Sequence, residues 1–337
     1  PQLFSGSVDL SNVYMPPPIL ERWQKTPNSN TALPEGFGFV MIFNSNKKPL
    51  DNKAVRQALA YVIPRQQISE AAYGTEEAAG GAWKEINTGI SPTLEKLYLK
   101  PEQLDQLNKY PLDPDKATQL LEGEGFTKKG DQWYQPDGKP FTLTFTANAD
   151  TSDIVTSFNS AAKALTAFGI KSEVNATSGA QQNADQHNGD FDIGSAFVGG
   201  SNPLGMYNSL LGPGYNFTRQ GNYAGKRGIG FGPKMTVPGL GEVDIVSTID
   251  VQSRTIEPGP EMDAQVWNWA QLVNEEVPYI WYATKVYQFP FSTKTFDNWP
   301  ALDQDGKTSE LWNIIGADLS GGLSLAIQQG YLTPKSS

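Results

Sequence analysis

The chain has 337 residues, of which 38% are hydrophobic and 11% aromatic, enough for the core of one large or two ordinary domains. Its net charge of −10, from 26 basic and 36 acidic residues, argues against nucleic acid and anionic membrane surfaces as partners, since both need basic patches. The lack of cysteine excludes disulfides, thiol catalysis and Cys-based zinc sites. No stretch approaches the ~18 apolar residues of a membrane helix, and no signal peptide is visible.

Residues 37–74 predict a strand, a loop and two helices. The apolar run 37–43 is dense enough for a strand that is buried on both faces. After a polar loop, Asp51 is placed to cap the first helix, because its carboxylate can accept from the free amide groups of the first turn. Pro64 ends this helix and can begin the second one, since the residue before a proline avoids the helical region.

Residues 80–92 predict a long surface loop that contains Trp83, followed by a short helix at 93–98. An aromatic side chain on a loop supplies a large contact area for stacking on a ligand. The alternative, which we favour for Trp83, is that it packs against a local cluster.

The next segments predict scaffold. Residues 110–145 predict a helix that is capped by Asp113 and ended by Gly125, and then a hairpin around Asp137 and Gly138 that joins two aromatic-rich strands. We expect no ligand chemistry from them.

The stretch from residue 154 onward alternates helix and strand. Apolar spacing predicts a helix at 154–168, ended by Gly169, then strands at 170–174 and 190–193. This alternation predicts an α/β lobe with a mixed sheet. The only histidine, His187, is predicted to lie solvated in a polar loop.

The loop at 197–203 is the predicted ligand site, because ligands of open α/β sheets lie at loops beyond strand ends. A second loop at 212–242 is rich in glycine and aromatic residues and holds Arg219 and Tyr223. It either reaches the ligand or is an insertion, and the sequence favours neither.

The C-terminal part predicts a helix at 262–276, a strand at 277–282 and a last apolar helix near 323–327. No Gly-x-Ser-x-Gly motif and no His-rich ligand set accompany these elements. The sequence therefore predicts no catalytic residue, no metal site and no cofactor.

The pattern around the first helix resembles the family 5 extracellular solute-binding proteins of ABC importers. The resemblance continues through residues 110–126, 165–171, 190–193 and 275–280 in family order. One departure is Pro64, where the family usually has Asp. The residues that match the first motif are Asn44, Pro49, Asp51, Val55, Arg56, Gln57, Ala58, Leu59 and Arg65. Most of them are expected to build the helix and its packing, so Arg56 and Gln57 should not contact a ligand.

The resemblance implies an α/β, periplasmic-binding-protein-like architecture of type II with two lobes. Residues 1–36 would be part of the first lobe, 37–285 the large C-terminal lobe, and 286–337 the return segment of the first lobe. Family members are usually longer, so we expect this chain to be a C-terminal fragment whose signal or lipoprotein sequence lies upstream. Such a fragment should bind ligand more weakly than the full-length receptor.

The implied function is that of a monomeric extracytoplasmic receptor, in the periplasm or as a cell-surface lipoprotein. It would capture an oligosaccharide or short peptide between two lobes by hinge closure, and deliver it to the membrane permease. A receptor specific for oligopeptides or dipeptides is the alternative, and a secreted hydrolase or a non-transporting sensor or scaffold is the alternative of another class. An enzyme is not expected.

The resemblance also bears on the ligand. In peptide receptors of the family, an Asp about four residues before a Pro pairs with the ammonium group of the peptide. Here that position falls on Gly199 or Gly200, which favours a neutral ligand such as an oligosaccharide. The predicted ligand-binding residues are Trp83, Phe197, Gly199, Gly200, Ser201, Asn202, Tyr207, Arg219 and Tyr223.

Overall fold

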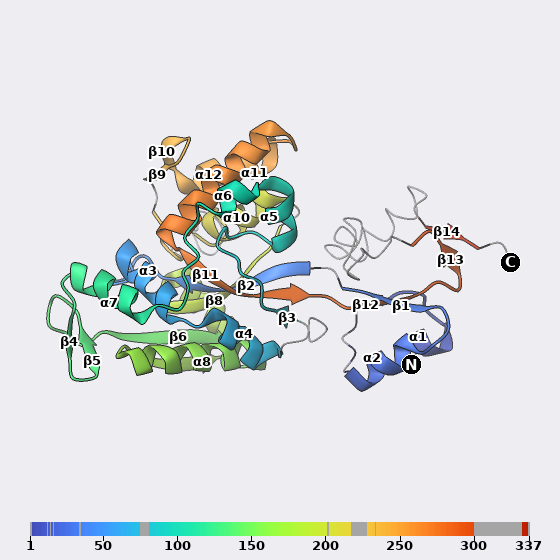
Figure 1. The fold of residues 1–337 in the computed structure, drawn as a ribbon, viewed down its shortest axis with the longest axis horizontal. Helices are drawn as coiled ribbons and strands as arrows, with labels where there is room; N and C mark the ends of the chain where they lie inside the picture. Colours follow the sequence, from blue (N-terminus) through green and yellow to red (C-terminus); the bar gives the residue numbers. More distant parts are fainter. Residues whose placement is uncertain are drawn as a thin grey trace. The chain divides into compact units, whose positions relative to one another are not determined.

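The computed structural model forms two compact units (Figure 1). Unit 1 comprises Pro1–Phe37, Tyr73–Ala82 and Thr284–Ser337, and unit 2 comprises Gly38–Ala72 and Trp83–Ala283. The division into a first lobe at 1–36 and 286–337 and a large lobe at 37–285 stays a prediction, and it did not place 73–82 with unit 1. The structure describes residues 2–11, 13, 15, 17–33, 35–74, 81–200, 202–216, 228–232, 234–299 and 332–335.

A mixed sheet of six strands organises the molecule, in the order β3-β11-β2-β8-β6-β7. Strand β2 is antiparallel to β8, while β6 is parallel to both β8 and β7. The predicted α/β architecture with a mixed sheet is confirmed. The strands are β2 (Glu35–Phe43), β3 (Gly81–Ala82), β6 (Thr142–Asn148), β7 (Lys171–Thr177), β8 (Ile193–Val198) and β11 (Tyr279–Val286).

Helices of unit 2 lie on both faces of this sheet. Figure 1 shows α8 along β6 on one face and α10, α11 and α12 on the other. The helices are α3 (Lys53–Val62), α4 (Arg65–Tyr73), α5 (Pro92–Tyr98), α6 (Pro101–Leu104), α7 (Pro114–Gly123), α8 (Ser152–Phe168), α9 (Gly179–Asn188), α10 (Pro203–Leu211), α11 (Ile245–Thr255) and α12 (Pro260–Glu276). Two hairpins complete the unit, β4 (Thr127–Lys129) with β5 (Gln132–Tyr134) and β9 (Lys234–Val237) with β10 (Gly241–Asp244).

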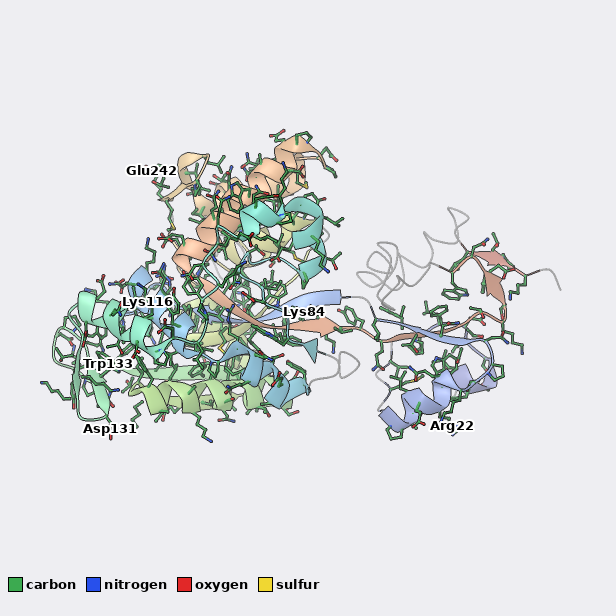
Figure 2. The ribbon with its side chains drawn as sticks, viewed as in Figure 1. Arg22, Lys84, Lys116, Asp131, Trp133 and Glu242 are labelled. Carbon is green, nitrogen blue, oxygen red and sulfur yellow. The ribbon has the colours of Figure 1, made fainter. Side chains whose placement is uncertain are left out.

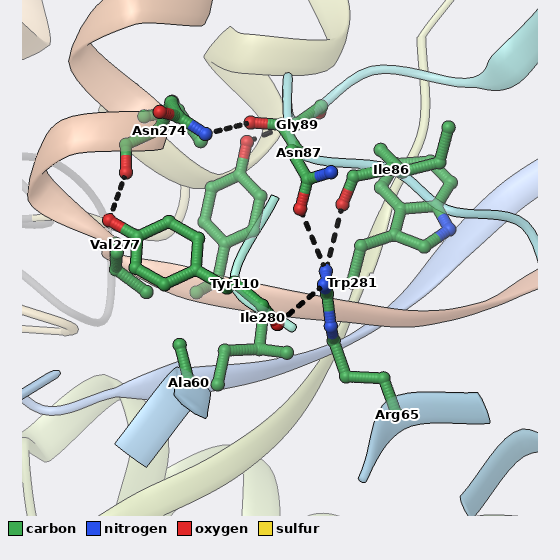
Figure 3. Close-up of a pocket in the computed structure, with 12 residues that line it drawn as sticks. Ala60, Arg65, Ile86, Asn87, Gly89, Tyr110, Asn274, Val277, Ile280 and Trp281 are labelled. Carbon is green, nitrogen blue, oxygen red and sulfur yellow. Dashed lines mark hydrogen bonds between the residues drawn. The ribbon is translucent and has the colours of Figure 1, made fainter. Parts of the chain in front are cut away.

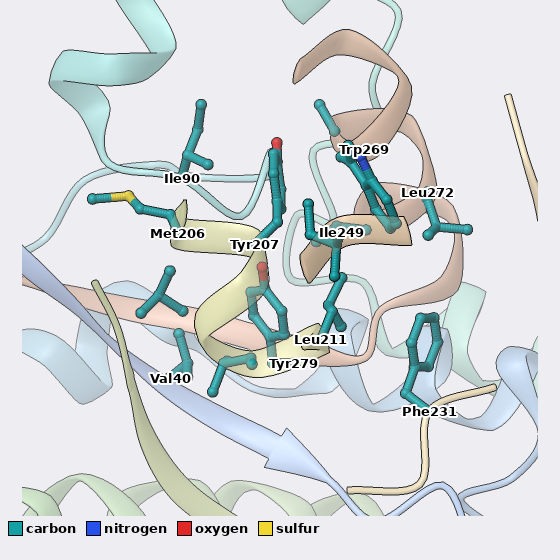
Figure 4. Packing of buried hydrophobic residues seen from close by; sticks show 14 of the residues in the cluster. Val40, Ile90, Met206, Tyr207, Leu211, Phe231, Ile249, Trp269, Leu272 and Tyr279 are labelled. Carbon is teal, nitrogen blue, oxygen red and sulfur yellow. The ribbon is translucent and has the colours of Figure 1, made fainter. Parts of the chain in front are cut away.

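The main core lies between the sheet and α10 to α12 (Figure 4). Val40 and Ile42 of β2 face this cluster, and Phe39, Met41 and Phe43 alternate with them. All five side chains are buried. The prediction of a strand buried on both faces is therefore confirmed, as expected for a central strand covered by helices.

Local signals fixed most helix ends. The Asp113 carboxylate accepts from the Lys116 amide at 2.9 Å, and Gly169 ends α8 with φ +108, as predicted. The prediction of Asp51 as a cap is wrong. Asn52 caps α3 instead, because its backbone is extended and its side chain accepts from Ala54 N.

The predicted turn at Asp137 and Gly138 is present, because backbone hydrogen bonds join Phe141 N to the Trp133 carbonyl and Gln135 N to the Lys139 carbonyl, both at 2.8 Å. The main pairings of the flanking strands lie elsewhere, with β5 on β4 and β6 on β7 and β8. Burial explains the choice, because β6 places Phe145 and Ala147 in the core of the central sheet. His187 lies in α9 and not in a loop. This helix is polar over its whole length and so lacks the apolar periodicity that predicts a helix.

The described part of unit 1 contains two pairs of short strands and two short helices. Strands β1 (Ser29–Ala32) and β12 (Phe289–Ser292) pair antiparallel, as do β13 (Phe296–Asp297) and β14 (Thr333–Pro334). Helices α1 (Gln2–Ser5) and α2 (Pro17–Gln24) hold the buried Leu3 and Trp23. The helix predicted near 323–327 lies outside the described residues. None of the described helices has the length and apolar character needed to cross a bilayer.

Candidate functional site

The candidate site lies at the end of the sheet where β8 finishes. Val198 is the partner of Gly38 in β2, and the loop 199–202 leads from there to α10. Strand β3 ends at this side of the sheet with Ala82 opposite Thr284 of β11, and Trp83 follows directly. Figure 2 shows the neighbouring Lys84 beside β3 and β11.

Phe197 presents an aromatic ring at this end of β8. It is 47% exposed, although its neighbours along the strand are buried. Its ring lies edge-on to the ring of Phe39, with 5.5 Å between the two ring centroids. The ring centroid of Phe39 lies in turn 6.3 Å from that of Tyr282. Three adjacent strands thus carry a row of aromatic rings on one face, and Phe197 is its exposed member. Such a ring offers apolar area for stacking.

Gly200 and Asn202 are both placed by the first turn of α10. Asn202 caps this helix, since its Oδ1 accepts from the Gly205 amide at 2.7 Å. A Cβ atom at Gly200 would lie 2.6 Å from the Gly205 carbonyl carbon and 2.7 Å from Met206 N. The first turn of the helix therefore requires glycine at position 200, whether or not a ligand approaches.

Replacing Gly200 with alanine should lower the free energy of unfolding by about 1–3 kcal/mol, because backbone atoms of α10 must move to admit the methyl group. Gly214→Ala is the matched control, since nothing lies within 4 Å of its Cβ position. Urea unfolding of both variants checks this. Equal midpoints would show that the loop has room for a side chain at 200.

Trp83 is half-buried and stacks on a guanidinium group. The Cζ atom of Arg65 lies over its ring, 5.5 Å from the centroid. Arg65 is 9% exposed and donates to the Ile86 carbonyl, Asn87 Oδ1 and the carbonyls of Lys109 and Tyr110, at 2.7–3.2 Å. Figure 3 shows Arg65 directed toward Ile86 and Asn87. Sequence reasoning assigned Arg65 to the family motif but missed its contact with Trp83, for which no local signal exists.

A small cavity lies beside Arg65 and is too small to be the site. It has a volume of about 30 Å³, which suits about one water molecule. Its polar lining comes from Arg65, Asn87, Tyr110 and Asn274, and the Tyr110 hydroxyl donates to the Asn274 carbonyl at 2.8 Å. The cavity cannot hold a sugar ring or a dipeptide.

Tyr207 lies in the core and not on a ligand-accessible surface. It is fully buried, its hydroxyl donates to the Thr88 carbonyl at 2.9 Å, and its ring lies 6.3 Å from Trp269. Figure 4 shows it beside Met206 and above Tyr279, and burial raises its pKa. We leave Tyr207 out of the candidate site, because no surface of its side chain faces solvent.

Phe197, Gly199, Gly200 and Asn202 lie along one segment from the end of β8 to the start of α10, and Trp83 directly follows β3 of the same sheet. The other predicted ligand residues, Ser201, Arg219 and Tyr223, lie outside the described residues. In the described part of the chain, no group of three or more His, Asp or Glu side chains could hold a metal ion.

Similar folds occur in periplasmic binding proteins of known structure. The periplasmic oligopeptide-binding protein of an oligopeptide ABC transporter from Thermotoga maritima, solved with bound mannohexaose, matches the whole chain with a TM-score of 0.64 and 21% identity. The oligopeptide-binding protein AppA from Bacillus subtilis, solved with a nonapeptide, matches 92% of the chain with a TM-score of 0.58 and 16% identity. The chain covers 60% and 57% of those proteins. The chain thus shares the fold of periplasmic binding proteins.

The family follows from the sequence comparison. The model of the bacterial extracellular solute-binding proteins, family 5, matches residues 2–217, and the chain belongs to this family. Heme-binding protein A of Haemophilus influenzae is 36% identical over 96 residues, 28% of this chain and 15% of that protein. The nickel-binding periplasmic protein of Escherichia coli is 30% identical over 147 residues, which are 41% of this chain and 25% of that protein. The dipeptide-binding protein of Escherichia coli is 35% identical over 101 residues, which are 29% of this chain and 17% of that protein. The matched stretches therefore span a quarter or less of these relatives.

Proposed function

We propose that the chain is part of an extracytoplasmic receptor of an ABC importer, located in the periplasm or anchored to the cell surface as a lipoprotein. The receptor would act as a monomer that binds a small-molecule ligand and delivers it to the permease. The observation that carries this proposal is the exposed Phe197 beside the uncharged loop 199–202, in a chain of this family. The family is one of transport binding proteins, and no catalytic role is proposed.

The ligand we propose is a neutral oligosaccharide. Where peptide receptors of the family would hold an Asp for the ammonium group, this loop has Gly199 and Gly200, and an unpaired ammonium out of water is costly. Phe197 and Trp83 would stack on sugar rings. Among the described residues, Asn202 Nδ2 donates to no protein acceptor, so it can donate to a hydroxyl. Ser201, Arg219 and Tyr223 would add polar and aromatic contacts.

A short peptide is the second candidate. It is favoured by relatives such as the dipeptide-binding protein of Escherichia coli and the glutathione-binding protein of Salmonella typhi, which is 32% identical over 142 residues. The two candidates differ in one chemical feature, the free ammonium group of a peptide.

Calorimetry on the full-length receptor distinguishes the candidates, with manno- and cello-oligosaccharides in one series and di- to pentapeptides in the other. We expect oligosaccharide binding without turnover, and weaker binding by the 337-residue chain alone. Tight peptide binding would contradict the sugar assignment, and product formation would contradict the receptor assignment.

Substituting the exposed aromatic residue tests the site itself. Phe197→Ala should weaken ligand binding about tenfold, which corresponds to about 1.4 kcal/mol for a lost stacking contact. Leu97→Ala is the matched control, because Leu97 is 61% exposed on α5 and belongs to no proposed site. Equal affinities of the two variants would place the ligand elsewhere.

A further inference from the structure

Arg65 is held rigidly beneath Trp83. Its guanidinium is nearly buried, and its four hydrogen bonds tie α4 to two separate loops, at 86–87 and at 109–110. A planar guanidinium that donates to several fixed acceptors loses little further freedom, so its position over the ring is well defined. One face of the Trp83 indole is therefore occupied by a cation.

The charge of Arg65 lacks a close counter-ion in the described part of the chain. All four acceptors are uncharged: the backbone carbonyl groups of Ile86, Lys109 and Tyr110, and the side-chain amide of Asn87. Glu85 favours the charged form from a distance, but burial has the larger effect and lowers the pKa of Arg65. An arginine nevertheless stays protonated, since its pKa ordinarily lies far above neutral pH.

A cation on one face of an indole changes what the other face can bind. The ring attracts cations through the negative potential of its π-system, and that potential is shared by both faces. The guanidinium of Arg65 already interacts with this potential on one face. A second cation stacked on the outer face would also lie about 10 Å from the guanidinium. At an effective dielectric constant of about 20, the repulsion between the two charges would weaken the affinity for that cation on the order of tenfold. A neutral ring meets no such penalty.

We propose that Arg65 is a positioning residue for Trp83 and that its charge makes the site discriminate against cationic ligands. This inference rests on the proposed function, in that Trp83 must contact the ligand. It assigns the preference for neutral ligands to a residue beneath the site, in addition to the glycines of the loop 199–202. Arg65 itself touches no ligand.

The test compares two ligands that differ only in charge, using the full-length receptor. Cellotetraose is the neutral probe, and the β-1,4-linked glucosamine tetramer, measured at pH 6, carries ammonium groups in place of the 2-hydroxyls. If the receptor binds peptides instead, the pair is one peptide with its N-terminus acetylated or free. The quantity measured is the ratio of the two Kd values, cationic over neutral.

Arg65→Gln should lower this ratio about tenfold, because it removes the charge, whereas Arg65→Lys should keep the ratio even if both affinities fall. A purely structural role would weaken both probes equally and leave the ratio unchanged in both variants, which would overturn the inference. If either variant fails to fold, the inference is tested instead by measuring how the ratio of the wild-type receptor depends on salt concentration. The inference requires the ratio to fall as ionic strength rises from about 10 to 500 mM, since salt screens the repulsion. A flat or rising ratio overturns it.

Trp83→Ala separates this inference from the function on which it rests. Weaker binding of the neutral probe in Trp83→Ala, together with an unchanged ratio in Arg65→Gln, overturns the inference and leaves the proposed site intact. Unchanged binding of both probes in Trp83→Ala removes Trp83 from the site and overturns the inference, while the receptor function stands. Binding of neither ligand class contradicts the proposed function itself.

Discussion

Replacing Asn44 with alanine should lower the free energy of unfolding by about 3–5 kcal/mol. Asn44 is fully buried, and its Nδ2 donates to the carbonyls of Gly189 and Phe191, both at 2.7 Å. Its Oδ1 accepts from the backbone amide and the side-chain amide of Asn46, both at 3.1 Å. Removing the side chain leaves buried groups without partners, at about 1–3 kcal/mol each.

The position of Asn44 explains why these bonds matter for the site. It lies just after β2 and holds the segment that leads into β8, where Phe43 is the partner of Ile193. A slip of one residue in this pairing would turn every side chain of β8 to the other face of the sheet, including Phe197. Asn44 therefore helps to fix the register at the end of the strands opposite the candidate site.

Urea unfolding followed by circular dichroism measures how far Asn44→Ala lowers the free energy of unfolding. Asn44→Asp should be at least as damaging, because it replaces a donor by a carboxylate oxygen that faces two carbonyl groups. Asn159→Ala is the control, since Asn159 is exposed on α8 and its replacement should change stability by less than about 0.5 kcal/mol. A midpoint for Asn44→Ala equal to that of the control would contradict the prediction.

Arg56→Met is the second large effect, with an expected loss of about 3–5 kcal/mol. Arg56 is 3% exposed, and its NH2 group lies 3.2 Å from Glu276 Oε2. It also donates to the carbonyls of Leu50 and Glu276, both at 2.9 Å. The variant keeps the volume of the side chain but leaves these acceptors unpaired. This arrangement supports the prediction that Arg56 builds the scaffold and does not contact the ligand.

The neighbouring Lys53 provides the control for Arg56. Lys53 pairs with Glu275 at 2.7 Å, but its side chain is 41% exposed and that of Glu275 is 63% exposed. Lys53→Met should therefore cost less than about 1 kcal/mol, as is typical of surface ion pairs. Thermal or urea unfolding of the two variants measures the loss in free energy of unfolding. Similar losses in both variants would contradict the prediction that the buried Arg56 contributes more than the exposed Lys53.

The sequence by itself determined the elements whose signals are local. The apolar run of β2, the cap at Asp113 and the glycine that ends α8 each depend on residues within a few positions of one another. The family motif around Arg56 was also readable, because its residues are contiguous. These features indicated the fold class and placed the candidate loop after β8.

Only the tertiary structure decided the features that depend on distant partners. The first turn of α10 leaves no room for a side chain at Gly200. Tyr207 is buried against Trp269, and β6 pairs with β7 in the central sheet, where its apolar side chains join the core. The stacking of Arg65 under Trp83 likewise joins two elements that no local pattern connects. Periodicity and capping describe short-range geometry, whereas close packing and burial of charge arise between segments far apart in the chain.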